Sequence, residues 1–197
     1  KNDPGSQGVE TELALNFSKI SVTDQPLSAN GRPGTPETFS FDLRENKTDA
    51  AVVASDLAVS AAATSIASNP VAVPASSPLH YYLKIDGLKG DVTAQGFEGW
   101  FAVDGYDIGV QNTGSIGSAG GGAGVGKAQF SPLTVDIHSL AGLASLFGDV
   151  ASGHALKSLE LAGVANVKDK STTVYDLKLS EVLVGSFKND PGTQGVE

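Results

Sequence analysis

A ten-residue segment occurs twice in this sequence, once at each end. Lys1–Glu10 and Lys188–Glu197 agree at nine of ten positions, and the exception is Ser6 against Thr193. The offset is 188 − 1 = 187 residues, so the sequence holds one repeat period and the start of the next. Repetition constrains the fold because every unit must meet its neighbours in the same way. We expect a window of a longer repetitive polypeptide, or a subunit whose ends meet a neighbour's. An engineered duplication is the alternative, and the Ser/Thr difference favours natural divergence.

Composition excludes several classes of function. The length of 197 residues predicts one domain with a long arm. The net charge is −9, from 13 basic and 22 acidic residues, and no basic cluster exists to form a nucleic-acid surface or a polybasic membrane anchor. The absence of Cys excludes disulfides and thiolate chemistry and fits an extracellular setting. No apolar run is long enough to predict a membrane-spanning helix.

Alternation of apolar and polar residues predicts an all-β architecture with one helix. Val9 to Gln25 is expected as one strand because apolar residues recur at every second position, and Phe39 to Leu43 alternates in the same way. Further strands are expected at Leu79–Val92, at Phe97–Val110 (a pair turning at Asp104–Gly105), at Phe130–Ile137 with Pro132 tolerated, and at 159–161 and 175–179 around a turn at 167–171.

The helix is predicted at Ser139–Val150, with Ser139 as its N-cap and Gly153 as its stop. Its expected buried face comprises Leu140, Leu143, Ala144, Phe147 and Val150.

Two segments have the composition of loops or linkers. Residues 47–78 are rich in Ala, Ser and Pro, which predicts an exposed arm between structured parts. The alternative is that Ala50 to Val73 packs along a neighbouring subunit, since its scattered Val, Leu and Ile residues would be awkward in water. Asn112 to Gly126 is a long Gly-rich loop.

No motif predicts catalysis, a cofactor or a metal site. The segment Gly121–Ala128 resembles a phosphate-binding loop, but Ala128 stands where a hydroxyl would hold Mg²⁺ and the following residues cannot open a helix. His80, His138 and His154 are scattered, and no Cys can join them in a zinc site. A weak Ca²⁺ site in a turn and a pair of carboxylates for glycoside chemistry stay open, although nothing in the sequence marks either.

Six segments together resemble one known family. They are Tyr82–Gly90, Gly120–Lys127, Ser139–Gly153, Lys178–Val184, Leu13–Val22 and Phe39–Asn46. The set is similar to the Hcp family, the tube-forming proteins of type VI secretion systems. The resemblance implies an Hcp-like β-barrel flanked by an α-helix, a self-assembling structural role and no enzymatic activity.

One departure from the family concerns the order of the elements. The element like Leu13–Val22 comes last in the family, and here it comes first. The repeat explains this if residues 1–46 are the C-terminal strands of one Hcp-like domain and 79–187 are the main body of the next. Residues 188–197 would then start the following repeat. The strand could fold back within this chain, or a successor's strand could complete the barrel, through one polypeptide or between chains. We favour completion across the repeat boundary.

This interpretation predicts a structural subunit of an extracellular filament or tube, joined head to tail by strand completion. The alternative function is a secreted repetitive binding or adhesion module. The expected strand-donor residues for self-association are Val9, Leu13, Leu15, Phe17, Ile20, Val22, Phe39 and Phe41. The expected loop residues at a subunit contact are Gly114, Ile116, Gly120, Gly124 and Val125.

Overall fold

The computed structural model describes residues 9–28, 31–48, 79–112, 127–139, 141–167 and 170–190. The predicted arm, apart from residues 47–48, and the Gly-rich loop from residue 113 to 126 lie outside these ranges, as does the last part of the second decapeptide. The elements are β1 Val9–Asn16, β2 Lys19–Asp24, β3 Glu37–Asp42, β4 Lys47–Thr48, β5 Leu79–Ile85, β6 Phe101–Asp107, β7 Val110–Asn112, β8 Ala128–Phe130, β9 Leu133–Ser139, α1 Leu143–Ser152, β10 Ala155–Val167 and β11 Lys170–Asp190.

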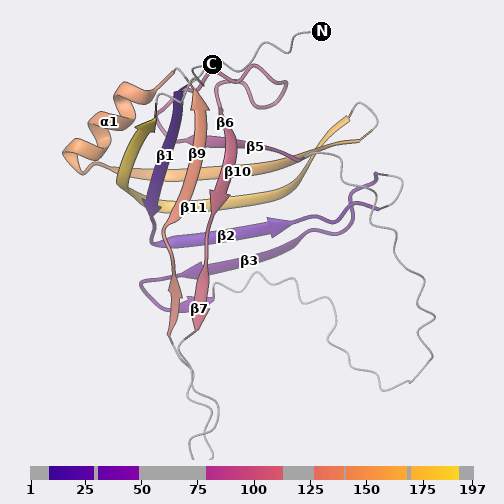
Figure 1. Cartoon of the computed structure of the whole chain (residues 1–197). Coiled ribbons are helices and arrows are strands. Elements are labelled where there is room, and N and C mark those ends of the chain that lie inside the picture. The colour runs from indigo at the N-terminus through magenta and orange to yellow at the C-terminus, as the bar shows by residue number, and fades with distance from the viewer. Residues whose placement is uncertain are drawn as a thin grey trace, which may run out of the picture.

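Six antiparallel strands close into a barrel. The order is β1-β9-β6-β5-β10-β11, and β11 pairs with β1 to complete the ring. Figure 1 shows β1, β9 and β6 running across β5, β10 and β11. The sheet then continues from β11 to β2, β3 and β4, which lie outside the ring. The prediction of a β-barrel with one helix is confirmed.

The core of the barrel is built by alternate residues of the strands, as the period-2 pattern requires. Side chains of one parity point inward and are almost completely buried. They are Leu13 and Leu15 on β1, Leu83 and Ile85 on β5, Phe101 on β6, Leu133, Val135 and Ile137 on β9, Leu159 and Leu161 on β10, and Leu177 and Leu179 on β11. The residues that made the alternation visible in the sequence are therefore the residues that pack together.

The segment predicted as one strand from Val9 to Gln25 is two strands, so that prediction was wrong. The chain turns a corner at 17–18, between β1 and β2. The Ser18 N–H donates to the Ser180 carbonyl at 3.2 Å, and the Ser18 carbonyl accepts from Leu43 N–H at 2.9 Å. The corner lets β1 form part of the barrel wall while β2 pairs with an earlier part of β11.

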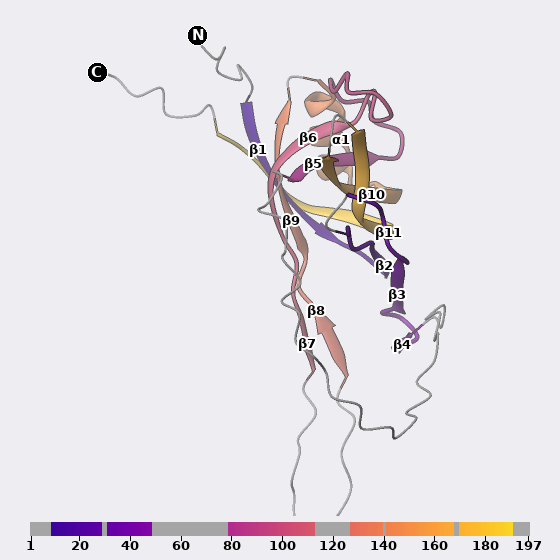
Figure 2. The ribbon, with the colours of Figure 1, turned by 90° about the vertical axis from the view of Figure 1, so that its right-hand side faces the viewer.

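Two other predicted strand boundaries were also wrong. Asp104–Gly105 is not a turn between two strands but a bulge within β6, where the pairing with β9 shifts between Val103 and Gly105. Pro132 is not inside a strand: β8 ends at Phe130 and β9 begins at Leu133. Proline has no N–H to donate to a ladder, so a break there is physically reasonable. Figure 2 shows the β7–β8 hairpin extending away from the barrel.

The N-cap of the helix lies three residues later than predicted, and the predicted buried face is correct only in part. Leu143 and Val150 are partly buried against the core, Ala144 is exposed, and Leu140 lies outside the described residues. Ser139 is the last residue of β9, and the N-cap is Gly142, whose φ of 75° suits glycine. A Cβ there would lie 3.0 Å from Phe101 Cζ. Leu146 is the buried residue of α1, whereas Phe147 is 62% exposed. The stop at Gly153 is confirmed by its left-handed φ of 67°.

Candidate functional site: the slot filled by β1

We call the space between β9 and β11 that β1 fills the β1 slot. β1 pairs antiparallel with β9 from Val9 opposite Ser139 to Leu15 opposite Leu133. On its other side it pairs with β11 from Glu10 opposite Asp190 to Asn16 opposite Leu183. Because β1 has a hydrogen-bonded neighbour on both sides, it is an interior strand of the barrel wall although it stands first in the sequence.

The inner face of β1 completes the barrel core. Thr11, Leu13 and Leu15 each have 0% exposed surface. Leu13 lies opposite Val135 on β9 and Phe187 on β11. Removal of β1 would therefore open the core as well as break two ladders of backbone hydrogen bonds, and each loss is unfavourable in water.

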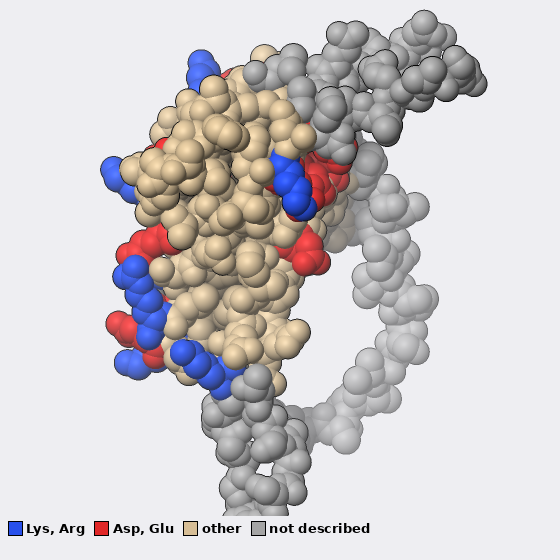
Figure 3. Space-filling view, turned by 60° about the vertical axis from the view of Figure 1, so that its left-hand side comes forward, with Lys and Arg blue, Asp and Glu red and all other residues tan. Residues whose placement is uncertain are grey.

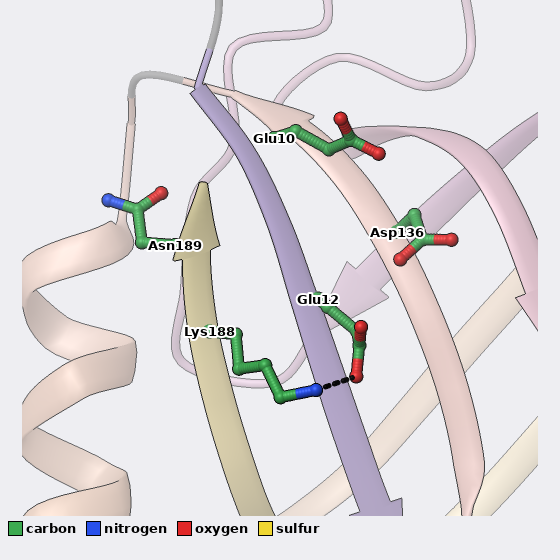
Figure 4. A pocket seen from close by; sticks show the side chains of 5 residues that line it. All are labelled: Glu10, Glu12, Asp136, Lys188 and Asn189. Atoms are coloured by element: carbon green, nitrogen blue, oxygen red, sulfur yellow. Dashed lines mark hydrogen bonds and ion pairs between the residues drawn. The ribbon is translucent and has the colours of Figure 1, made fainter. Parts of the chain in front are cut away.

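Polar contacts between β1 and the end of β11 mark the register. Lys188 Nζ donates to Glu12 Oε1 at 3.0 Å, and Thr11 Oγ1 donates to Asn189 Oδ1 at 3.2 Å. Figure 4 shows Lys188 reaching across from β11 to Glu12 on β1. The Lys188 side chain is 70% exposed, so the ion pair contributes little stability, and its importance lies in pairing specific positions.

The outer face of the slot is a shallow acidic hollow of about 470 Å³. Glu10 and Glu12 come from β1, Asp136 from β9, and Lys188 and Asn189 from β11 (Figure 4). Among the residues that the structure describes, no three His, Cys, Asp or Glu side chains are grouped so that they could hold a metal ion. The hollow is therefore a charged surface where β1 meets β9 and β11, and its described residues do not form a metal site.

A bulge lies opposite the end of β1. The pairing passes from Ala14–Ser186 to Leu15–Val184, so Gly185 of β11 has no partner residue. A Cβ on Gly185 would approach Asn16 Nδ2 to 2.8 Å. A side chain at position 185 would therefore displace the end of the Asn16 side chain, and the bulge leaves Gly185 outside the ladder.

β11 changes partner along its length. Residues Tyr175 to Ser180 pair with β2, and Leu183 to Asp190 pair with β1. Between the two parts Glu181 has a φ of 53°, which is uncommon for a residue with a side chain. Its carboxylate forms an ion pair with Arg44, which follows β3. One long strand therefore binds β1 and β2 as a connected block.

Asp42 at the end of β3 connects the start of β2 with the turn that follows β3. Its Oδ2 lies 2.9 Å from Lys19 Nζ, and its Oδ1 accepts from the N–H groups of Arg44 and Glu45. The hydrogen bond from Lys19 is the main reason that the pKa of Asp42 lies below its ordinary value, and the backbone donors act in the same direction. Asp42 is therefore charged in the folded protein at neutral pH.

Tyrosines fill one end of the barrel rather than forming a reactive site. The Tyr81 and Tyr106 rings lie 5.2 Å apart, and those of Tyr106 and Tyr175 lie 5.9 Å apart. Gly163 lies between Tyr81 and Tyr175 in the strand register and leaves room for both rings. Burial raises the pKa of Tyr106 far above its ordinary value and also raises that of Tyr175. These phenols stay protonated at neutral pH.

The structure places most of the predicted strand-donor residues in the β1 slot or on β2 and β3, which continue the sheet beyond β11. Leu13, Leu15, Ile20 and Phe41 are buried, Phe17 and Val22 are partly buried against the core, and Phe39 is 42% exposed. Val9 takes a place in the ladder opposite Ser139. The predicted loop residues Gly114, Ile116, Gly120, Gly124 and Val125 lie outside the described residues, so their role stays a prediction.

Sequence reasoning missed the polar residues of the slot. Lys188 and Asn189 belong to the repeated decapeptide, and that repetition was a signal that could have singled them out. Thr11 shares the parity of Leu13, which could have marked it as inward-facing. The isolated Gly185 within a strand-like segment was a signal for the bulge, because glycine inside a strand often marks one.

Charged side chains of both signs lie on the described surface outside the slot. On the face drawn in Figure 3, Lys and Arg side chains are interspersed with Asp and Glu and form no continuous basic surface. His138 Nδ1 lies 3.1 Å from Asp104 Oδ2, within a strand pair rather than a metal cluster. In the described part of the chain, no helix has the length and apolar character needed to cross a membrane.

Comparison with protein families decides the relationship. The family described as "Type VI secretion system effector, Hcp" matches residues 82–197, which is more than half of the chain. The chain belongs to the Hcp family. The match covers β5 to β11 and continues through the second decapeptide, and it does not include β1 to β4. A comparison with curated proteins gives no match.

Solved structures of type VI secretion proteins show a partial likeness to this Hcp-family chain. One described as a type six secretion system protein is 20% identical, with a TM-score of 0.42, covering 56% of this chain and 79% of that one. A mutant of Hcp1 from the E. coli EAEC 042 pathovar is 18% identical, with a TM-score of 0.41 and coverage of 57% and 87%. Hcp1 from Salmonella typhimurium is 19% identical, with a TM-score of 0.34 and coverage of 60% and 89%.

Proposed function

We propose that this Hcp-family chain is a structural subunit that assembles with copies of itself into a filament or tube outside the cell. Its units are joined head to tail by strand completion at the β1 slot. The proposal assigns no catalytic step to the chain. Membership of the Hcp family supports a role in type VI secretion.

The position of β1 is the observation that carries this proposal. Residues 79–190 supply the other barrel strands β5, β6, β9, β10 and β11, but they do not contain the strand that lies between β9 and β11. In this structure the chain's own β1 fills the slot, which is the first of the two closures expected from the sequence. Completion across the repeat boundary stays a prediction.

An empty slot would be strongly unfavourable. The facing edges of β9 and β11 would expose unpaired N–H and C=O groups, and the core would lose Leu13 and Leu15. Such an edge binds any strand of suitable pattern, as in other cases of strand addition. A second copy of residues 9–48 carries that pattern by definition and is the natural occupant.

Strand exchange of this kind has a direction. One unit gives residues 9–48 and receives at β9 and β11, so the giving and receiving surfaces differ. A contact between two different surfaces extends from unit to unit unless rotation closes it into a ring. A fibre or a closed ring follows from this contact, and stacking of rings into a tube requires a further contact between rings. A repetitive binding module that stays monomeric does not follow from it.

Mixing two full-length cysteine variants tests the proposal. Glu12 and Lys188 lie opposite each other in the β1–β11 ladder, and the protein contains no cysteine. One chain carries Glu12→Cys and the other Lys188→Cys, and the two are unfolded, mixed, refolded and oxidised. We expect disulfide-linked dimers of the two variants on a non-reducing gel, and fibres or rings of the unmodified chain by electron microscopy.

A matched pair within the body provides the control. Lys84 on β5 and Glu160 on β10 also lie directly opposite each other, but both belong to residues 79–190. Chains carrying Lys84→Cys and Glu160→Cys should give no mixed dimers, whereas a single chain carrying Glu12→Cys and Lys188→Cys should form the bond internally. Absence of Glu12/Lys188 mixed dimers, in a protein that stays monomeric at every concentration, would contradict the proposed function.

A further inference from the structure

A second hollow lies on the outer face of the barrel and shares no residue with the β1 slot. Its volume is about 420 Å³, which is within the range of small-molecule sites. We call it the aromatic hollow, and among its lining residues are Tyr82, Gln95, Phe97, Val164, Asn166 and Ser171. All of its lining residues belong to residues 79–190, so the aromatic hollow does not depend on which strand fills the β1 slot.

One wall of the aromatic hollow is the end of the β10–β11 hairpin. The pairing of β5 with β10 starts at Leu79 opposite Ala165, and the hairpin extends further, as Figure 1 shows. On this projecting part Asn166 and Ser171 lie opposite each other, and Ser171 Oγ donates to Asn166 Oδ1 at 2.7 Å. This hydrogen bond fixes the Asn166 amide and leaves its Nδ2 group to donate to a ligand.

The facing wall is the segment between β5 and β6. It folds back on itself, and the Gly90 N–H donates to the Gly99 carbonyl at 2.8 Å. A Cβ at position 90 would clash with the Trp100 carbonyl oxygen, so the close approach of the two backbone segments requires glycine. This local fold brings Gln95 and Phe97 to the aromatic hollow.

Stacked aromatic rings give the aromatic hollow a fixed shape. The rings of Tyr82 and Phe97 are stacked with their centroids 4.7 Å apart, and the Trp100 ring meets that of Phe97 edge to face at 5.1 Å. Phe97 is therefore held in place although it lies outside the strands and the helix. Because the rings already pack on one another, a ligand would bind without a large loss of side-chain entropy.

The chemistry of the lining favours an uncharged polar ligand. Among the described residues that line the aromatic hollow, none has a charged side chain. The polar side chains end in amides, on Gln95 and Asn166, or in hydroxyls, on Tyr82 and Ser171. The net charge of −9 on the whole protein also opposes the approach of anions. The aromatic hollow therefore fits a neutral ligand that has both apolar faces and many hydrogen-bonding groups.

A sugar ring has this combination of groups. One face of a pyranose carries C–H groups, which are attracted to the negative face of an aromatic ring, and its rim carries hydroxyls that pair with side-chain amides. We propose that the aromatic hollow binds a neutral saccharide chain. A sugar packs on Phe97 and Tyr82, and its hydroxyls form hydrogen bonds with Gln95 and Asn166. Units joined in a polymer would present this site repeatedly, which would strengthen binding to a polysaccharide.

A proline-rich peptide is the competing occupant, because such segments also bind aromatic-lined grooves. Proline residues offer only carbonyl acceptors to a binding site. The amides of Gln95 and Asn166, one on each wall, contain both donors and acceptors. A ligand with hydroxyl groups can pair with all of these groups, so the lining favours the saccharide.

Titration of the full-length protein with tetrasaccharides tests the inference. The neutral probes are cellotetraose, maltotetraose and chitotetraose. Tetragalacturonate is the anionic comparison, and a peptide with the sequence of residues 70–78 is the proline-rich one. Calorimetry measures the affinity, and the fluorescence of Trp100, the single tryptophan, reports a ligand that contacts the adjoining Phe97. We expect at least one neutral probe to bind and to change this fluorescence.

Substitutions in the aromatic hollow locate the bound saccharide. Gln95→Ala and Asn166→Ala change exposed side chains, and each should weaken binding about two- to tenfold, the effect of one lost hydrogen bond. Phe97→Ala should weaken it about tenfold through the lost ring contact. Gln111→Ala is the matched control, because this exposed amide lies on β7 outside the aromatic hollow, and its affinity should be unchanged. Urea unfolding verifies that each variant is folded.

Three results would overturn the inference. The first is no binding of any neutral probe at about 10 mM, where a Kd of about 1 mM gives about nine-tenths occupancy. The second is binding of tetragalacturonate or the peptide alone. The third is saccharide binding that none of the three substitutions in the aromatic hollow weakens. Each result leaves the proposed strand completion untouched, because the mixing experiment measures disulfides at the β1 slot.

Discussion

Replacing Leu13 with alanine should destabilise the protein more than the same replacement at the exposed Leu183 on β11. Leu13 has 0% exposed surface and lies between Val135 and Phe187 in the barrel wall. The substitution removes three buried carbon groups, worth about 2.4 kcal/mol at about 0.8 kcal/mol for each group. A residual cavity of about 50–80 Å³ adds about 1–2 kcal/mol at about 24 cal/mol per Å³.

We therefore expect Leu13→Ala to lower the free energy of unfolding by about 3–4 kcal/mol. Leu183→Ala is the matched control, because Leu183 lies on β11 near the slot but is 43% exposed. Its loss should cost less than about 1 kcal/mol. Urea unfolding followed by the fluorescence of Trp100, the single tryptophan, measures both values.

Equal effects of Leu13→Ala and Leu183→Ala would refute the reasoning. They would mean that β1 does not occupy the slot in solution, or that the slot is loosely packed. Introducing Leu13→Ala into the two-variant mixing experiment gives a second measurement, the yield of disulfide-linked dimers. A chain with Leu13→Ala should donate its strand poorly while still accepting a normal strand from its neighbour.

Three further predictions concern the helix, the β2–β3 block and the Gly-rich loop. Leu146→Ala should cost about 2–5 kcal/mol because that side chain is completely buried, whereas Phe147→Ala should cost less than about 1 kcal/mol because its ring is 62% exposed; urea unfolding separates the two. The pKa of Asp42 in the folded protein lies below its ordinary value of 3.8, so the ionised carboxylate stabilises the fold. This stabilisation is complete when the pH is well above 3.8. It is lost as the pH falls from 3.8 through the lower pKa of the folded state. In the unmodified protein the urea midpoint should decrease between about pH 6 and pH 3, and in Asp42→Asn this decrease should be smaller. An equal decrease in both proteins would show that Asp42 does not contribute to the pH dependence of stability. Deletion of residues 118–124 should impair assembly, seen by electron microscopy, without changing the unfolding curve, and normal assembly would show that the loop makes no subunit contact.

The sequence by itself determined the class of fold and the family. Alternation in segments such as Leu13–Phe17 and Tyr81–Ile85 is a local property of a strand with one face in the core, so it could be read without coordinates. Gly153 was recognisable as a helix stop because helices commonly end at a residue with left-handed φ, which glycine adopts at little cost. The repeated decapeptide predicts the place where one unit would meet the next.

Only the tertiary structure decided which strands are neighbours and where they bend. The corner at 17–18 depends on hydrogen bonds to Ser180 and Leu43, which are distant in sequence. The helix begins after Gly142 rather than at Ser139 because Ser139 is held in β9 opposite Val9. Leu146 rather than Phe147 is buried because the barrel lies beneath one side of α1, and a helical repeat alone cannot identify that side. Pairing register is a long-range property, since each partner is fixed by residues that the local pattern does not contain.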